Sequence, residues 1–355
     1  MKASWARLDL SFRFVARTSR ETMTQKPTWF LRLRADDGSE ALGECALFHG
    51  LSADDCPDHV FERRLNDLCH ALADGASYEE IRDRFADHSA LLTGLETAWL
   101  SLKNGGLVAP SPFTAGQSDI AINGLVWMGS HDEMLERINS KLYEGFTTIK
   151  LKIGGINFDD ELALLQSIRN RYTPEQIELR LDANGAFKPG EALARLERLS
   201  RFTIHSIEQP IAARQPGAMA EICRNSPIPV ALDEELIGVK SNAEKAELLD
   251  FICPQYIILK PTLCGGISAA SQWVNLARQR EIGSWYTSAL ESNVGLSAIA
   301  QAAFAEYGPD AMPQGLGTGE LYHNNVPGPI ERRGSRLCFC PERPLEIPNL
   351  QWTEV

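Results

Sequence analysis

The sequence predicts an α/β protein in which a parallel (β/α) barrel follows an N-terminal α+β capping domain. From about residue 120, short apolar segments typical of strands alternate with amphipathic helical segments. This is the pattern of right-handed βαβ units in a parallel sheet. Charged residues follow these strands at intervals of 25 to 30 residues, which is about the length of one βα unit in a barrel of about 250 residues.

The first hundred residues have a different pattern and predict the capping domain. Alternating runs on either side of Asp37 and Gly38 predict a β-hairpin. Helical periodicity follows in three segments, at about 57–73, 77–86 and 90–106. The segment VAPSPFTAGQS is rich in Pro, Gly and Ser and is typical of a domain boundary. We therefore expect a capping domain over residues 1–115, joined by the C-terminal segment 320–355, and a barrel over residues 116–319.

Eight strands are expected in the barrel. They lie at about 120–126, 147–152, 178–182, 203–207, 229–232, 256–260, 283–287 and 312–315. Eight strands over about 200 residues favour a closed barrel over an open sheet. In a closed barrel the carboxyl ends of the strands meet at one mouth, where active sites of this fold lie.

The composition fits an enzyme that acts on a small molecule. The 355 residues carry a formal charge of −12, which argues against binding to nucleic acid or to a membrane surface, since both require basic patches. No apolar run approaches the roughly 20 residues that span a bilayer, and the N-terminus lacks the apolar stretch of a signal peptide. We expect a cytoplasmic protein whose eight cysteines are reduced, buried thiols.

Three carboxylates end consecutive predicted strands: Asp182 in LRLDANGAF, Glu208 in HSIEQPI and Asp233 in PVALDEEL. Any one of them alone is better explained as a helix cap or an ion-pair partner. Together in a barrel mouth they are crowded, which raises their pKa values and costs folding free energy unless a divalent cation binds. Because Mg²⁺ prefers carboxylate oxygens as ligands, we predict a magnesium site.

Two lysines lie on the strand before these carboxylates. Lys150 and Lys152 are two positions apart and project from the same face of the strand, whereas the apolar Ile149, Leu151 and Ile153 take the other face. On an outer face two lysines are merely solvated, but this alternation places them inside the barrel. Neighbouring ammonium groups lower each other's pKa, which suits a lysine base near neutral pH.

A third lysine, Lys260 in YIILKPTLCGG, ends the sixth predicted strand. In a closed barrel of eight strands the sixth strand lies opposite the second, which carries Lys152. A lysine on each side of one substrate atom is a two-faced acid–base arrangement.

The strand-end motifs together resemble the muconate-lactonizing subgroup of the enolase superfamily. They are K-x-K on the second strand, D-A-N on the third, E-Q-P on the fourth, D-E on the fifth and K-P on the sixth. The resemblance covers essentially the whole chain and implies the barrel and capping domain of that superfamily. Four further motifs, GECALFHGLS, INGLVWMG, SALESNVGLSAIAQ and GLGTGELY, are most similar to those of the o-succinylbenzoate synthases.

The resemblance implies catalytic roles for five residues. Asp182, Glu208 and Asp233 are expected to bind Mg²⁺. Lys152 is expected to abstract a proton. Lys260 is expected to face the planar intermediate through a cation–π contact.

The resemblance also implies a substrate and a reaction. Lys150 and Asn184 are expected to position a ring carboxylate, and Ser288 with its neighbours to receive a succinyl tail. The activity is that of a carbon–oxygen lyase: the Mg-dependent syn-dehydration of a succinyl-hydroxycyclohexadiene carboxylate to o-succinylbenzoate in menaquinone biosynthesis. The metal offsets the charge that develops on deprotonation, and the departing hydroxide takes its proton from Lys152.

Related activities differ at positions that the sequence can test. Dipeptide epimerases typically carry Asp-x-Asp on the eighth strand, where this chain has MPQGLGTGEL. Mandelate racemase-like members carry a histidine on the seventh, where it has GSWYTSALES. N-succinylamino acid racemase and muconate cycloisomerase stay open as alternatives. A non-catalytic binding scaffold is disfavoured, because such a chain is expected to lose at least one of five costly charges.

Two further groups of residues have two interpretations each. His49, in the loop LFHGLS, is either a surface histidine or a substrate contact from the capping domain. Arg13, Arg17 and Arg20 lie in the polar segment 13–26 between two predicted strands. That segment is either a solvated loop or a mobile lid over the barrel mouth.

Overall fold

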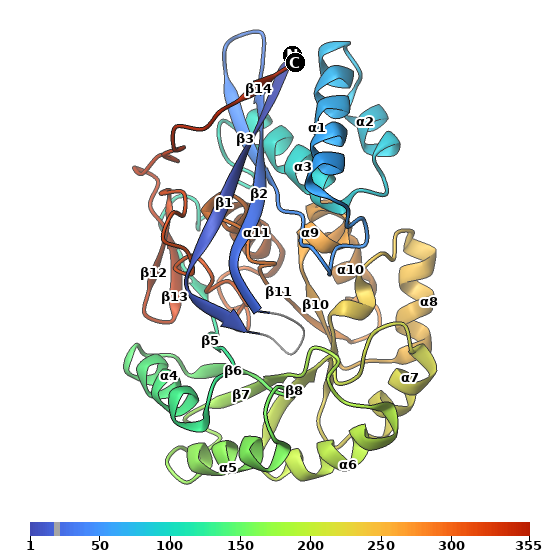
Figure 1. Cartoon of the computed structure of the whole chain (residues 1–355), viewed down its shortest axis with the longest axis vertical. Helices are drawn as coiled ribbons and strands as arrows, with labels where there is room; N and C mark the ends of the chain where they lie inside the picture. Colours follow the sequence, from blue (N-terminus) through green and yellow to red (C-terminus); the bar gives the residue numbers. More distant parts are fainter. Residues whose placement is uncertain (18–21) are drawn as a thin grey trace.

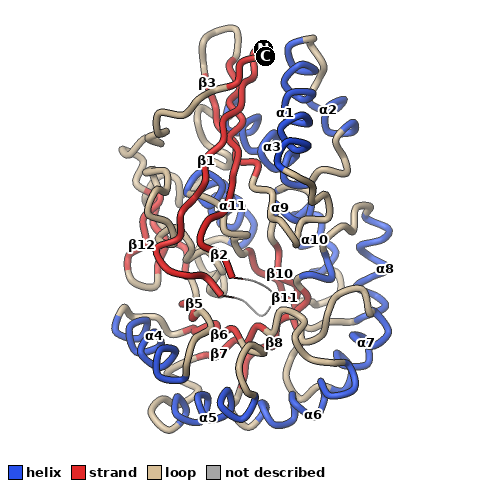
Figure 2. Tube along the Cα trace, viewed as in Figure 1, coloured by secondary structure: helices blue, strands red, loops and turns tan. Residues whose placement is uncertain are grey.

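The computed structural model describes residues 1–17 and 22–355. An antiparallel sheet with three helices beside it lies above a ring of parallel strands, and further helices surround that ring (Figures 1 and 2). The two predicted parts of the chain, an α+β unit and a parallel barrel, are thus both present.

The upper unit is built on an antiparallel sheet. In sheet order its strands are β14 (Thr353–Glu354), β1 (Lys2–Arg17), β2 (Thr22–Arg34) and β3 (Glu40–Cys45). Its helices are α1 (Asp58–Ala73), α2 (Tyr78–Arg84) and α3 (Ser89–Lys103). Alternate residues of β2, among them Trp29 and Leu31, are fully buried in one core with helix residues such as Phe61 and Leu95. The predicted hairpin is confirmed, since β2 pairs with β3 across a turn in which Gly38 has a φ of 87°.

The lower unit is a ring of parallel strands. Seven form one sheet in chain order: β5 (Gly124–Val126), β6 (Thr148–Lys152), β7 (Glu178–Asp182), β8 (Ile204–Glu208), β9 (Val230–Leu232), β10 (Tyr256–Leu259) and β11 (Gly283–Tyr286). The eighth predicted strand is reduced to two parallel bridges, Ile122 with Gln314 and Thr287 with Gly315. A Cβ at Gly315 would lie 2.1 Å from Thr287 Oγ1, so glycine is required for this close approach.

Eight helices follow the ring strands. They are α4 (His131–Tyr143), α5 (Phe158–Arg169), α6 (Pro189–Ser200), α7 (Pro216–Asn225), α8 (Asn242–Ile252), α9 (Pro261–Cys264), α10 (Ile267–Arg278) and α11 (Asn293–Tyr307), and a 3₁₀ turn, η1, spans Glu234–Leu236. Reciprocal capping boxes start α4 and α8, at Ser130 and Ser241, and satisfy otherwise unpaired backbone N–H groups.

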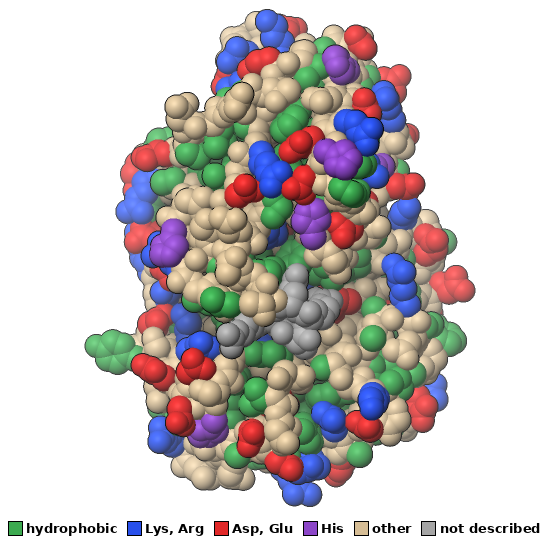
Figure 3. Space-filling model, viewed as in Figure 1, with side chains coloured by type: hydrophobic (Ala, Val, Ile, Leu, Met, Phe, Trp, Pro, Cys, Tyr) green, Lys and Arg blue, Asp and Glu red, His purple; other side chains and the backbone are tan. Residues whose placement is uncertain are grey.

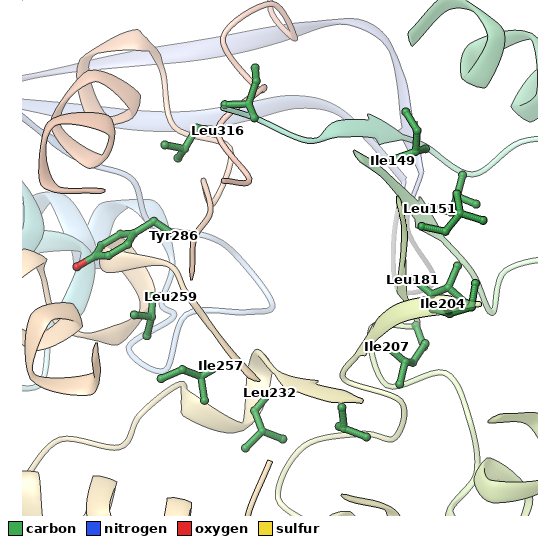
Figure 4. Packing of buried hydrophobic residues seen from close by; sticks show 14 of the residues in the cluster. Ile149, Leu151, Leu181, Ile204, Ile207, Leu232, Ile257, Leu259, Tyr286 and Leu316 are labelled. Carbon is green, nitrogen blue, oxygen red and sulfur yellow. The ribbon is translucent and has the colours of Figure 1, made fainter. Parts of the chain in front are cut away.

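The alternation of each strand separates an apolar outside from a mixed inside. Ile149, Leu151 and Leu181 belong to the large core outside the ring, and Figure 4 shows such side chains around the ring's outer side. The residues between them point inward. At the amino-terminal level of the ring the Arg180 guanidinium lies 4.6 Å from the centre of the Trp285 ring. These inward-facing side chains fill the interior of the ring at its amino-terminal level. The open mouth therefore lies at the carboxyl ends of the strands.

The C-terminal segment contacts both units. Strand β14 pairs with β1 at Trp5 and Thr353, as expected if this segment returns to the capping unit. Strands β12 (Ile330–Arg333) and β13 (Arg336–Phe339) instead form a small sheet with β4 (Ile120–Ala121), next to the barrel. The exact division of the chain at residues 115 and 320 stays a prediction.

The segment 13–26 differs from the prediction of a loop. Strand β1 continues to Arg17 and β2 begins at Thr22, so Arg13 and Arg17 lie in a strand, whereas Arg20 lies outside the described residues. The physical reason is packing: Phe12 and Ala16 are buried in this stretch, and a register shift between Ser11 and Ala16 keeps the pairing going.

The surface carries charges of both signs. Acidic and basic side chains are interspersed over the face shown in Figure 3. Within the described residues, no helix is long and apolar enough to cross a membrane. All eight cysteines are unbridged, as predicted; six are buried, Cys56 is half-buried and Cys253 is exposed.

Candidate active site

A cavity at the carboxyl ends of the ring strands is lined by both units. The barrel strands and the residues that directly follow them contribute polar groups, Lys150, Lys152, Asn184, Lys260, Thr287 and Ser288. The capping unit contributes apolar ones, Met23, Phe48 and Leu51. The predicted lysines, Asn184 and Ser288 therefore all face one space.

The three predicted carboxylates lie together beside this cavity. Asp182 ends β7, Glu208 ends β8 and Asp233 directly follows β9. The parallel register places Asp182 opposite Glu208. All three are almost fully buried, with exposed fractions of 0–2 %, so local structure brings them together as the strand-end pattern predicts.

Lysine ammonium groups lie against these carboxylates. Lys150 Nζ lies 2.9 Å from Asp182 Oδ2 and also contacts Glu208 Oε2. Lys152 Nζ lies 2.8 Å from Asp182 Oδ2. On the far side of the ring Lys260 pairs with Asp233 Oδ2. Since β6 and β10 are four strands apart in a ring of eight, Lys152 and Lys260 approach the cavity from opposite sides.

These ion pairs shift the pKa values of the buried groups. Burial opposes the charged form of Lys150, but Asp182 and Glu208 raise its pKa overall, and the lowering expected for two ammonium groups close to a metal ion stays a prediction. Burial likewise opposes ionisation of Asp182 and Asp233, yet the lysines lower their pKa values. Of the three carboxylates, Glu208 alone has the raised pKa expected for crowded carboxylates. Burial, and then the charge of Asp182, raise it.

Asn184 holds the end of Lys152 in place. Its Oδ1 accepts a hydrogen bond of 2.7 Å from Lys152 Nζ, and its Nδ2 donates to Glu234 Oε1 at 3.1 Å. Its backbone has a φ of 44°, a left-handed conformation that asparagine tolerates better than most residues. The D-A-N motif thus supplies a carboxylate and, two residues later, an amide for the same ammonium group.

Comparison with known proteins connects this geometry to a family. Residues 133–344 match the family model described as Enolase C-terminal domain-like. The o-succinylbenzoate synthase of Desulfotalea psychrophila (strain LSv54 / DSM 12343) is 46 % identical over 95 % of this chain and 98 % of its own length. The chain belongs to the o-succinylbenzoate synthase family of the enolase superfamily.

Solved structures agree with this family assignment. The crystal structure of MenC from Desulfotalea psychrophila LSv54 matches 95 % of this chain and 99 % of its own, with a TM-score of 0.84 and 45 % identity. The dipeptide epimerase from Enterococcus faecalis V583, complexed with Mg and L-Leu-L-Tyr, has a TM-score of 0.82 over 97 % of both chains. Its 17 % identity shows a shared fold only. The capping unit and barrel are therefore those of the enolase superfamily.

The donor set of this o-succinylbenzoate synthase family member fits a hard divalent cation. Asp182, Glu208 and Asp233 supply carboxylate oxygens from adjacent strand ends, and Glu208 Oε1 is buried with no hydrogen-bond partner in the described part of the chain. Over residues 1–17 and 22–355 no three acidic, histidine or cysteine side chains form a ready metal cluster, because the lysines lie between the carboxylates. Metal binding thus requires these ammonium groups to move aside.

The wall from the capping unit could not be assigned from the strand-end pattern. Phe48 and Leu51 line the cavity, and the motif GECALFHGLS contains Phe48. His49 of this motif is half-buried and held by Asp55 and Asp58, each 2.8 Å from one of its ring nitrogens. It is not among the residues that line the cavity, which favours the surface interpretation.

Proposed function

We propose that this chain dehydrates a succinyl-hydroxycyclohexadiene carboxylate to o-succinylbenzoate, as a cytoplasmic step of menaquinone biosynthesis. The observation that carries the proposal is the pair Lys152 and Lys260, which approach one cavity from opposite sides of a carboxylate cluster. The o-succinylbenzoate synthase that shares 46 % of its residues over nearly the whole chain supports this choice within the superfamily.

Asp182, Glu208 and Asp233 are the residues that would hold Mg²⁺. When bound, the ion compensates the negative charge that develops on the substrate carboxylate as the adjacent carbon loses its proton. Lys150, whose ammonium group already contacts two of these carboxylates, holds positive charge on the same side of the cavity and positions the substrate carboxylate.

Lys152 carries out both proton transfers. As a neutral amine its Nζ takes the proton from the carbon next to the carboxylate. The same Nζ then gives that proton to the hydroxyl group that leaves from the same face, so the C–O bond breaks, a C=C bond forms and water departs. Asn184 holds Nζ at 2.7 Å and is not one of the proposed metal ligands, so this contact limits the position of Nζ through both steps.

Lys260 acts from the opposite face without moving a proton. It keeps its charge because Asp233, although burial opposes it, raises the pKa of Lys260. A permanent cation over the planar, electron-rich ring stabilises negative charge in the transition state. Ser288 and the residues after it line the part of the cavity that receives the succinyl tail.

The test is an assay of the purified protein with two substrates. With Mg²⁺ present, the cyclohexadiene substrate should be converted to o-succinylbenzoate, which is followed by the loss of the ultraviolet absorbance of the conjugated diene. N-succinyl amino acids in deuterated water should exchange their α-proton much more slowly. Fast exchange without any dehydration would replace the synthase proposal with a racemase.

A further inference from the structure

A short loop forms the cavity wall between β11 and α11. Ser288, Ala289 and Leu290 all line the cavity. Leu290 has a φ of 64°, a left-handed conformation that a branched side chain rarely adopts. Its N–H donates to Ser288 Oγ at 3.0 Å and its carbonyl accepts from Tyr322 Oη at 2.7 Å. Strained backbone of this kind persists only where surrounding groups hold it.

Glu291 holds this loop from behind. Its side chain is buried, and Oε2 accepts hydrogen bonds from Ser288 Oγ at 2.6 Å and from the Ala289 N–H at 2.7 Å. Oε1 accepts from Thr262 Oγ1 at 2.6 Å. Thr262 lies two residues after Lys260. The Glu291 carboxylate therefore hydrogen-bonds both to the loop after β11 and to the segment that carries Lys260. Hydrogen bonds to an ionised carboxylate are stronger than neutral ones.

A buried lysine of the capping unit interacts electrostatically with Glu291. Lys26, on β2, is 4 % exposed, and its Nζ makes no hydrogen bond with any described residue. Burial lowers the pKa of Lys26, while Glu44 and Glu291 oppose this. Its Nζ also lies 5.8 Å from the centre of the Phe48 ring, and Phe48 lines the cavity. Lys26 of the capping unit thus lies behind the cavity wall, and its ammonium group has no hydrogen-bond partner among the described residues.

Glu44 extends this contact between the units. It lies on β3 and accepts hydrogen bonds from the N–H and Oγ of Ser292 and from the Gly295 N–H, at 2.5–2.9 Å. These groups form the start of α11, directly after Glu291. The capping unit therefore contacts the C-terminal end of the segment that shapes the wall.

We propose that Glu291 is a positioning residue for the tail-binding wall, and that Lys26 supplies its counter-charge from the capping unit. The assignment of this wall to the substrate tail rests on the proposed function. The shape of the wall then depends on the capping unit being docked, because the cation and Glu44 both come from it. Glu291 touches no substrate and acts through Ser288 and Ala289.

Three variants separate the hydrogen bonds from the charge. Glu291→Ala removes both. Glu291→Gln retains an oxygen for Ser288 and Ala289 and presents its amide to the Thr262 hydroxyl, which can accept a hydrogen bond. Lys26→Met removes only the counter-charge and keeps an unbranched side chain. The matched control is Glu306→Gln on α11, the helix that follows Glu291, whose carboxylate accepts hydrogen bonds from Ser271 and Arg278 away from the cavity.

Two measurements are made on each variant: KM and kcat for the dehydration, and hydrogen–deuterium exchange of the amides of residues 288–290. Glu291→Ala should raise KM roughly tenfold, leave kcat within about threefold and speed exchange, since it removes the acceptor of three buried donors. Glu291→Gln should restore KM to within about threefold of wild type, and Lys26→Met should lie between the two. Glu306→Gln should change neither quantity.

The proposal is overturned if Glu291→Ala changes neither KM nor exchange, or if Glu291→Gln is no better than Glu291→Ala. If Glu291→Ala does not fold, Thr262→Val removes only the Oε1 partner, and unchanged exchange in that variant overturns the proposal as well. Exchange needs no substrate. A wild-type protein that fails to dehydrate the cyclohexadiene therefore refutes the proposed function alone, and the exchange data still decide the role of Glu291.

Discussion

The two walls of the cavity differ in how they treat charge. The barrel wall presents three lysines next to three buried carboxylates, and every one of those carboxylates contacts an ammonium group. The capping wall presents Met23, Phe48 and Leu51, and the buried carboxylate of its loop, Asp54, has no hydrogen-bond partner in the described part of the chain. Under the proposed function, the barrel wall would perform the proton transfers, whereas the apolar capping wall would contribute to substrate binding.

Removal of the metal should have the largest effect on turnover. Chelation should abolish turnover, because the ion is proposed to compensate most of the charge that develops on the substrate carboxylate, and added Mg²⁺ should restore it. Thermal unfolding with and without Mg²⁺ provides a readout independent of activity, since a ligand that binds only the folded state raises Tm. Full turnover in excess chelator, with no metal found by elemental analysis, would refute the assignment of Asp182, Glu208 and Asp233.

Loss of Lys152 is expected to have the next largest effect. Lys152→Ala should lower kcat by at least roughly 10²–10⁴-fold, since the same group serves as base and acid, while the far-ultraviolet circular dichroism stays that of the folded protein. A variant that keeps more than about a tenth of the wild-type kcat would show that another group moves the proton.

Lys260 separates a one-base elimination from a two-base racemisation. Lys260→Arg keeps the positive charge, although the guanidinium geometry differs, so dehydration should remain measurable and exceed that of Lys260→Ala. Arginine does not lose its proton in this pH range, so any exchange of the α-proton of N-succinyl amino acids from that face should stop. Equal dehydration rates for the Arg and Ala variants would argue against an electrostatic role.

A substitution in the capping wall should change KM and leave kcat almost unchanged. Phe48→Ala removes a large apolar contact from the cavity and should raise KM by about tenfold, the order expected for a lost apolar contact, with kcat changed little. Steady-state kinetics on the cyclohexadiene substrate measure both. A fall in kcat equal to that of Lys152→Ala would show that the two walls do not differ in their roles in catalysis and binding.

The smallest expected effect is the change in Tm when Asp54 is substituted. Burial raises its pKa to about 6, so the ionised form destabilises the fold above that pH, and the penalty disappears as the pH falls through the folded pKa. Asp54→Asn should therefore raise Tm by roughly 1–3 °C near pH 7.5 and by less near pH 5.

A neighbouring carboxylate provides the control of opposite sign. Although burial opposes it, the Gly50 N–H and His49 lower the pKa of Asp55, so its ionised form stabilises the fold at neutral pH, and this contribution is lost as the pH falls through the folded pKa. Asp55→Asn should accordingly lower Tm near pH 7.5. A higher Tm for both variants would argue against the pairing difference between Asp54 and Asp55.

Strand periodicity predicted the barrel wall because each position there depends on local geometry. Once Ile149 and Leu151 face outward, Lys150 and Lys152 must face inward, and parallel strands bring Asp182 beside Glu208. The raised pKa of Lys150 could not be predicted in this way, because it depends on where one flexible ammonium group settles between two carboxylates.

The capping wall depends on contacts between distant segments. Phe48 and Ser288 line one cavity although 240 positions separate them, and no periodicity describes how two separate units dock. The eighth strand was predicted but is only two bridges long, because the approach of Gly315 to Thr287, and not a run of β-forming residues, closes the ring.

Closure of the ring through these bridges has a consequence for the order of folding. Ile122 and Gln314, which meet at the seam, are 192 positions apart, so this contact closes a much longer loop than the pairing of neighbouring ring strands and gains little from local structure. The cavity takes Asn123 and Leu125 from one side of the seam and Gly317 and Thr318 from the other. A partly folded chain with an open seam can already carry Lys152 beside Asp182, yet it has no complete substrate cavity, so substrate binding requires the seam to close.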